Sequence, residues 1–326
     1  MTQYARHESR QVSRRSRSKR VVGLTVCAVL VLAAAIALAI NAPWRSFQAK
    51  HSVRYLGVYE PDAPGSYSEV NQFAREISWQ PNLVSYYSSW LEPFSTSFAT
   101  SAAKHGAVTL VQLDPENVSL EGIAHGRYDA YLRSYAAAVK AFHGEVVLSF
   151  GHEMNGNWYS WGREHTSPGV FVAAWRRVVN EFRIVGARNV IWLWTVNIIN
   201  TQPFIPAPGP WWPGKAYVDW VGIDGYYYSP SWNFASLFGP TIVAVRSLTR
   251  DPILIAETGA SNAAGQAAKI TDLFQGIQSY GLLGFVWFDV NDVKQALDWR
   301  LDSPAALAAY ADDAKAFMIG GSVRAR

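Results

Sequence analysis

The run Glu145-Val-Val-Leu-Ser-Phe150 leads directly into the polar, glycine-containing stretch Gly151-His-Glu-Met-Asn-Gly-Asn-Trp158. A helical pattern follows over Val170–Val185, and a second apolar run, Val190–Asn197, comes after it. Short strands that are apolar on both faces are typical of parallel sheets whose two faces are covered. The segment therefore predicts a strand–helix–strand unit whose first strand ends in polar residues.

The same unit recurs along the chain. Successive strand ends lie between 25 residues apart (Ser89 to Asp114) and 47 residues apart (Phe150 to Asn197). Eight such units predict an α/β fold, a (β/α)8 TIM barrel over residues 54–320. A doubly wound open sheet is the alternative, although no strand ends in a GxGxxG or P-loop motif. The eight apolar runs are Tyr55–Glu60, Leu83–Trp90, Ala107–Asp114, Glu145–Phe150, Val190–Asn197, Val218–Gly225, Pro252–Glu257 and Gly284–Asp289. Helical patterns between them include Tyr128–Phe142, Val170–Val185, Gln266–Tyr280 and Pro304–Met318.

The formal net charge of +4 comes from the N-terminus. Residues 1–20 hold seven Lys or Arg and one Glu, so the rest of the chain has 22 basic and 24 acidic residues, a balance of −2. A body with this balance has no electrostatic reason to bind nucleic acid. The single cysteine, Cys27, excludes intramolecular disulfides and cysteine-based metal sites.

An uncharged apolar run, Val21–Ile40, follows the basic tail of residues 1–20. At about 1.5 Å per residue this run matches a hydrocarbon core of roughly 30 Å, and the basic flank indicates that the tail stays in the cytoplasm. We expect a transmembrane anchor over residues 21–40, a short linker over 41–53 and an extracytoplasmic body. A cleavable signal peptide with Ala37-Leu38-Ala39 at its cleavage site, and hence a secreted protein, is the alternative.

The crossover between Asn197 and Val218 contains five prolines and no helical periodicity. Proline lacks a backbone donor, so we expect an ordered surface loop here. Trp211 and Trp212 lie in this loop. They either cover the side of the barrel or form the wall of a substrate cleft.

Two glutamates, Glu153 and Glu257, come at the ends of the fourth and seventh apolar runs. The working residues of (β/α)8 barrels gather at the carboxyl ends of the strands, so these side chains would face each other across the barrel mouth. Paired carboxylates hydrolyse glycosidic bonds, one protonating the leaving oxygen while the other attacks or activates water. Aromatic rings stack on the apolar faces of sugars. The candidate binding residues at these strand ends are His152, Trp158, Tyr226 and Trp287.

Motifs for other hydrolytic chemistries are absent. No histidine follows His152-Glu153 at the HExxH spacing, and no GxSxG elbow occurs. The seven histidines form no ligand pattern. We therefore expect neither a metal nor a cofactor.

Three motifs stand at the predicted strand ends: His152-Glu153-Met154-Asn155-Gly156-x-Trp158, Val218-Asp219-Trp220-Val221-Gly222-Ile223-Asp224-Gly225-Tyr226 and Ala256-Glu257-Thr258-Gly259. Together they resemble glycoside hydrolase family 26, the β-mannanase family within the retaining barrel-fold clan. The resemblance extends from about Tyr55 to Met318. It implies that Glu153 is the general acid/base and Glu257 the nucleophile.

The resemblance implies further roles. Tyr226 would hydrogen-bond the nucleophile, Asp224 would support the same site, and Trp287 would form the platform under the sugar ring. The residues implied to line the sugar subsites are His152, Trp158 and, as a weaker candidate, Trp161.

The implied reaction is double displacement with retained configuration by an endo-β-glycanase, with β-1,4-mannan as the first expected substrate. The family also contains β-1,3-xylanases and mixed-linkage β-glucanases. Many members carry a further sugar-binding histidine near an early strand, and strands one to three offer none here, so the substrate stays open among these glycans.

Two other hypotheses remain. One is a non-catalytic polysaccharide-binding protein on the same scaffold, against which the presence of both glutamates argues. The other is a hydrolase of the cell's own exported polysaccharide, tethered beside its synthase. The sequence does not indicate an oligomeric state.

Overall fold

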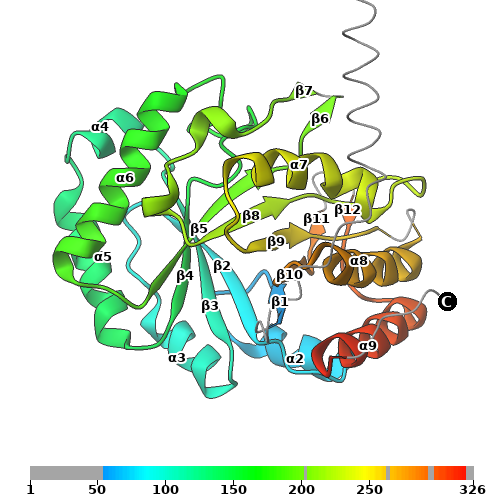
Figure 1. Cartoon of the computed structure of the whole chain (residues 1–326). Coiled ribbons are helices and arrows are strands. Elements are labelled where there is room, and N and C mark those ends of the chain that lie inside the picture. Colours follow the sequence, from blue (N-terminus) through cyan, green and yellow to red (C-terminus); the bar gives the residue numbers. More distant parts are fainter. Residues whose placement is uncertain (1–53, 202–203, 262–264, 293–296, 321–326) are drawn as a thin grey trace, which may run out of the picture. The chain divides into compact units, whose positions relative to one another are not determined.

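The computed structural model describes residues 54–201, 204–261, 265–292 and 297–320. Eight parallel strands close a barrel in the order β1-β10-β9-β8-β5-β4-β3-β2, and helices surround it (Figure 1). This closure confirms the predicted (β/α)8 fold and excludes the open sheet. The barrel strands are β1 (Tyr55–Tyr59), β2 (Leu83–Ser89), β3 (Val108–Asp114), β4 (Val146–Phe150), β5 (Val190–Asn197), β8 (Trp220–Asp224), β9 (Ile253–Thr258) and β10 (Gly284–Phe288).

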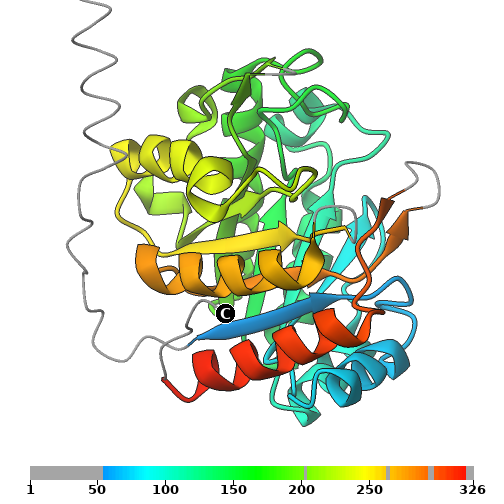
Figure 2. The ribbon, with the colours of Figure 1, turned by 90° about the vertical axis from the view of Figure 1, so that its right-hand side faces the viewer.

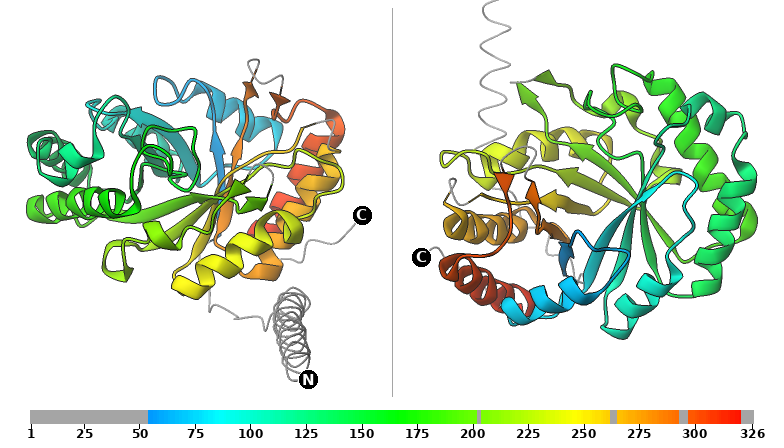
Figure 3. Two further views of the ribbon diagram at one scale, coloured as in Figure 1. Left: turned by 90° about the horizontal axis from the view of Figure 1, so that it is seen from above. Right: turned by 180° about the vertical axis from the view of Figure 1, so that it is seen from behind.

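The helices form the outer layer of the molecule (Figure 3). The Gln266–Tyr280 and Pro304–Met318 patterns are confirmed to the residue. The Val170–Val185 pattern lengthens at its start, because the Ser167 side chain accepts a hydrogen bond from Val170 N–H and Pro168 occupies the first turn. The helices are α2 (Ser68–Glu76), α3 (Thr96–Lys104), α4 (Leu120–Ala124), α5 (Asp129–Phe142), α6 (Pro168–Val185), α7 (Phe234–Leu248), α8 (Gln266–Tyr280) and α9 (Pro304–Met318).

The barrel closes between its first and last strands. Residues Tyr55 to Tyr59 pair in parallel with Gly284 to Phe288. Figure 2 shows α9, in red, alongside β1, in blue. The guanidinium of Arg54, just before β1, lies 5.0 Å from the ring centroid of Phe317 in α9, so the C-terminal helix covers this seam.

The side chains of the barrel strands alternate between two apolar clusters. Outward residues such as Trp194 and Trp287 pack against the helices. Inward residues fill the barrel interior toward the amino ends of the strands. Above the inward apolar layer the interior becomes polar, with Ser149 and Thr195 hydroxyls 2.9 Å apart. The inward apolar cluster consists of Tyr55, Leu83, Leu110, Val147, Leu193, Leu254, Ala256 and Val286.

The proline-rich crossover covers the flank of the barrel. It contains the short strands β6 (Asn200–Thr201) and β7 (Phe204–Ile205) and the 3-10 turns η1 (Gly209–Trp211) and η2 (Lys215–Tyr217). Trp211 is buried, and Trp212 packs edge-on to the outward side chain of Trp194, with ring centroids 5.0 Å apart. The two tryptophans therefore cover the barrel side, and the cleft-wall interpretation is wrong.

No helix in the described ranges is long and apolar enough to cross a membrane. The predicted tail (1–20), anchor (21–40) and linker (41–53) lie outside the described residues.

Candidate active site

A β-bulge in β9 aims Glu257 into the barrel. Ile223 pairs with Ile255 and the next residue, Asp224, pairs with Glu257, so β9 holds one extra residue at this point. Because Ala256 already faces the interior, strict alternation would have turned Glu257 outward. Bulges next to active sites commonly redirect a side chain in this way.

Both carboxylate oxygens of Glu257 accept hydrogen bonds from tyrosines. The Tyr226 hydroxyl donates to Oε2 at 2.7 Å, and the Tyr87 hydroxyl from β2 donates to Oε1. Burial, followed by the charge of Glu257, holds the pKa of both tyrosines well above the usual range. The tyrosines therefore stay protonated, and they fix the orientation of the carboxylate.

Glu153 stands on a strained turn that follows β4. Its φ is 54°, in the left-handed region that non-glycine residues rarely adopt, and Gly151 two residues earlier has a φ of 57°. The Glu153 N–H donates to Thr195 O at 3.0 Å, which fixes the turn to β5. Such strain at a buried acidic residue is common at active sites.

Neighbouring groups set the charge of the Glu153 carboxyl. Trp158 Nε1 donates to Oε2 at 2.7 Å, and the Asn197 side chain donates to Oε1. Burial raises the pKa of Glu153 to about 7; a positive charge on His152 would oppose this increase, and Glu257 adds to it. A carboxyl with this pKa can hold a proton near neutral pH and donate it.

His152 is enclosed beside the two glutamates. It is 1% exposed, and its ring nitrogens lie 2.8 Å from Asp114 Oδ1 and 3.0 Å from the Tyr159 hydroxyl. Trp161 is also buried, donates to the backbone oxygen of His152 at 2.7 Å and stacks on Tyr159. His152 and Trp161 therefore have no surface free for a sugar, whereas Trp158 is 45% exposed.

The structure does not place Trp287 at the barrel mouth. It is fully buried on the outer face of β10, packs edge-on to Tyr310 of α9, and donates from Nε1 to Trp299 O at 3.0 Å. The expected platform role of Trp287 is therefore wrong, because β10 alternates and only Val286 and Phe288 point inward.

Other aromatic rings border the glutamates instead. Trp299 follows the hairpin of β11 (Asn291–Asp292) and β12 (Leu297–Asp298), and its ring centroid lies 4.9 Å from that of Tyr226. Tyr228 packs edge-on to Trp299 with ring centroids 5.3 Å apart, lies 6.2 Å from the Tyr226 ring and is 51% exposed. Tyr228 therefore offers an accessible ring close to the nucleophile.

Asp224 lies at the carboxyl end of β8 and has no exposed surface. Neither carboxyl oxygen has a hydrogen-bond partner among the described residues. Burial, with smaller contributions from Glu257 and Glu153, holds the pKa of Asp224 well above its usual range. Burial therefore favours the protonated form of Asp224 beside the paired glutamates.

The sequence analysis missed six residues of this site: Tyr87, Asp114, Tyr159, Asn197, Tyr228 and Trp299. Side chains in a strand alternate between its two faces, so every second residue after an inward apolar residue also points inward. This rule identifies three of the missed residues, because it leads from Leu83 to Tyr87, from Leu110 to Asp114 and from Leu193 to Asn197. Trp299 has no such signal because a hairpin brings it back to the mouth.

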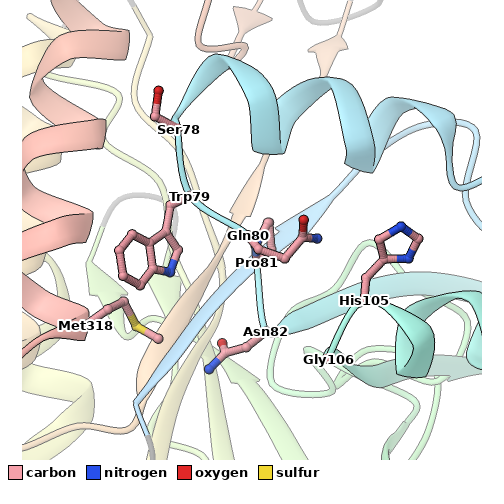
Figure 4. Close-up of a pocket in the computed structure, with 8 residues that line it drawn as sticks. All are labelled: Ser78, Trp79, Gln80, Pro81, Asn82, His105, Gly106 and Met318. Carbon is pink, nitrogen blue, oxygen red and sulfur yellow. The ribbon is translucent and has the colours of Figure 1, made fainter.

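A concave surface lies away from the glutamates, at the opposite end of the barrel. This groove of about 440 Å³ lies where the chain enters β2 and β3, between Trp79, His105 and Met318 (Figure 4). It contains no carboxylate. In the part of the chain that the structure describes, no group of three or more His, Cys, Asp or Glu side chains could hold a metal ion.

Comparison with known proteins finds a family match over more than half of the chain. A sequence model described as glycosyl hydrolase family 26 matches residues 95–296. The chain belongs to this family. The family 26 match includes Glu153 and Glu257, together with the three motifs that suggested it.

The names of individual relatives refer to different substrates. The family 26 chain is 33% identical over 256 residues to endoglucanase H of Acetivibrio thermocellus, covering 74% of this chain and 27% of endoglucanase H. It is 28% identical over 174 residues to the β-1,3-xylanase TXYA of a Vibrio species, covering 49% of this chain and 36% of that one. The chain therefore spans only about a quarter to a third of the length of these curated relatives.

Solved structures share the fold. The family 26 β-mannanase BoMan26A of Bacteroides ovatus matches with a TM-score of 0.64 at 15% identity, covering 87% of this chain and 93% of that one. The YdhT protein of Bacillus subtilis matches with a TM-score of 0.62 at 16% identity, covering 81% and 86%.

Proposed function

We propose that this domain is a retaining endo-β-glycanase that hydrolyses a β-linked polysaccharide by double displacement. Glu257 would attack the anomeric carbon while Glu153 protonates the leaving oxygen. Glu153 would then remove a proton from the water that releases the sugar. The hydrogen bonds from Tyr87 and Tyr226 hold the nucleophile in a fixed orientation.

One observation carries this proposal. The strand ends bring together two buried carboxyl groups in different environments, Glu257 held by two tyrosine hydroxyls and Glu153 with a pKa near 7. This is the division of labour that glycoside hydrolysis requires. A binding protein would need neither the strained turn nor the raised pKa of Glu153.

The substrate is a choice between β-glycans. The resemblance makes β-1,4-mannan the first candidate. The 33% identity to endoglucanase H over 256 residues favours a β-glucan as the second. Aromatic rings accept either sugar, since both present apolar faces.

Sugar release from mannan, glucomannan, mixed-linkage β-glucan and β-1,3-xylan tests the proposal. We expect the full chain to cleave one of these and Glu153→Ala and Glu257→Ala to lose at least about 10³-fold in kcat. Glu164→Ala is the matched control, since Glu164 lies in the same loop as Glu153 and is exposed. Product anomers should keep the β configuration at early times.

Other outcomes identify the error. Cleavage of glucan or xylan alone would replace the mannan assignment and keep the mechanism. Early α-anomers would contradict double displacement. Binding without cleavage by the native chain would support the non-catalytic scaffold instead.

We also propose that residues 21–40 tether the enzyme to the outer face of the membrane. The length and apolar character of that run and its basic flank support this location. Membrane fractionation of the full chain tests it, because a cleaved signal peptide would leave the enzyme in the soluble fraction with a new N-terminus after Ala39.

A further inference from the structure

His152 is too enclosed to contact substrate directly. Its ring packs against Tyr87, Tyr159 and Trp161, and both ring nitrogens are already occupied. A side chain with 1% exposure and no free nitrogen can affect the reaction only through its neighbours. One of these neighbours is Asp114, at the carboxyl end of β3. Its Oδ1 lies 2.8 Å from Nδ1 of His152.

We propose that Asp114 is a positioning residue that keeps His152 as an imidazolium beside Glu153, and that this pair sets the pH range in which Glu153 can act as an acid. The proposal rests on the proposed function of Glu153. It gives a role to Asp114, a residue that neither the sequence motifs nor the comparisons with known proteins single out.

The charge of Asp114 favours the charged ring. Asp114 and His152 have side-chain exposures of 9% and 1%, so water screens their attraction little. Burial alone disfavours a charged imidazole, but the charge and hydrogen bond of Asp114, together with the charges of Glu257 and Glu153, raise the pKa of His152 to about 9. The Tyr159 hydroxyl can accept the second ring proton.

The positive charge of the imidazolium opposes two other influences on the pKa of Glu153. Burial and the charge of Glu257 raise the pKa of Glu153, whereas His152 lowers it. Without the imidazolium, Glu153 would hold its proton to a higher pH. The titratable groups around His152 are Tyr87 on β2, Asp114 on β3, Glu153 and Tyr159 after β4, and Glu257 on β9. Those around Glu153 also include Asp224 on β8 and Tyr226 and Tyr228 after it.

A neutral ring would fit the same two distances, since Nδ1–H could donate to Asp114 while Nε2 accepts from Tyr159. In that case Asp114 would only orient the ring. The charge of His152 in the native chain therefore decides the question.

The direct test is the protonation state of His152 by ¹⁵N NMR of its ring in the full chain at pH 7, assigned by comparison with His152→Gln. We expect both ring nitrogens to be protonated. A neutral ring at pH 7 would overturn the proposal. This measurement needs neither activity nor a folded Asp114 variant.

The pH dependence of kcat/KM gives the second test. We expect Asp114→Asn, whose amide oxygen can still accept from Nδ1–H, to move the basic limb upward by about half a pH unit or more. His152→Gln should move it in the same direction, and the double variant should add nothing further. Asp219→Asn is the matched control, because Asp219 accepts from Trp192 N–H and acts on neither His152 nor Glu153.

A loss of kcat at every pH without movement of the limb would show a purely structural role and contradict the proposal. Failure of the proposed function looks different. The native chain would then cleave no glycan, while the NMR result for His152 would stand unchanged.

Discussion

Glu153 combines an unfavourable backbone with a buried carboxyl, and neighbours compensate for both. Thr195 fixes the turn through its carbonyl, and Trp158 and Asn197 each donate to one carboxyl oxygen. A left-handed conformation costs about 1–3 kcal/mol, which surrounding contacts must offset. The residue is thereby held in place with a pKa suited to an acid.

The rate should therefore fall as Glu153 loses its proton. With a pKa of about 7, Glu153 is protonated below and ionised above that pH, so kcat/KM should decline on the alkaline side of about pH 7. A pH profile from 5 to 9 checks this. A basic limb below pH 5.5 would contradict the raised pKa.

The two tyrosines on Glu257 should each contribute to the reaction. Tyr87→Phe removes one donor to the nucleophile while leaving the ring, and we expect kcat/KM to fall about 10- to 100-fold, as for hydrogen bonds to charged groups. Tyr310→Phe is the control, because its buried hydroxyl has no partner among the described residues. Equal rates for Tyr87→Phe and the native chain would show that Tyr226 alone positions the carboxylate.

Trp287 and Trp158 should respond oppositely to substitution. Trp287→Phe removes buried volume under α9, so we expect the free energy of unfolding to fall by about 1–3 kcal/mol with KM unchanged. Trp158→Ala should instead raise KM and leave stability nearly unaltered. Denaturant unfolding and saturation kinetics check both, and a higher KM for Trp287→Phe would restore its platform role.

At the scale of the elements, single residues decide where strands can meet. The bulge in β9 turns Glu257 inward. The closing pair of β1 and β10 requires Gly284, because a Cβ there would lie 1.8 Å from Tyr55 O and the φ is 149°. Neither constraint involves catalytic chemistry, yet both are needed for the site to form.

Gly284→Ala should open this seam. We expect the free energy of unfolding to fall by about 3 kcal/mol or more, since backbone atoms cannot move aside. Gly169→Ala in α6 is the matched control, because its Cβ would meet nothing within 4 Å; it should stabilise by up to about 1 kcal/mol through helix propensity. Denaturant titration measures both, and equal midpoints would refute the strain at the seam.

At the scale of the whole molecule, stability should fall as pH rises. Burial and then Asp289 raise the pKa of Glu60 to about 9, and burial raises the pKa of Asp289 to about 7. The folded state therefore keeps protons that the unfolded chain releases above about pH 4 to 5. The stability that these protons provide is complete below that pH and is lost progressively up to about pH 9.

Glu60→Gln should flatten this dependence. The amide stays neutral at every pH, so we expect a gain of about 1 kcal/mol or more at pH 8 relative to the native chain, and less at pH 5. Urea unfolding at both pH values measures it, with the exposed Glu121→Gln as control. An unchanged slope with Glu60→Gln would show that Glu60 is ionised in the folded state.

The sequence predicted the barrel well because its strands are continuous apolar runs with polar ends. It placed Glu153 and Glu257 at the correct ends of strands four and seven. It failed for Trp287, where membership of an apolar run was taken as proximity to the mouth, although neighbouring residues in a strand face opposite sides. It also left Trp211 and Trp212 undecided, since nothing local says which surface a proline-rich loop covers.

By itself, therefore, the sequence determined the fold class, the two candidate carboxylates and the family, because periodicity and strand-end chemistry are local properties. Only the tertiary structure decided which carboxylate oxygens accept hydrogen bonds from Tyr87, Tyr226, Trp158 and Asn197, since these side chains lie on or follow different strands. The same is true of the Asp114–His152 pair, which lies 38 residues apart in sequence. Charges and pKa values depend on burial and on neighbours in space, and closing the barrel creates both at once.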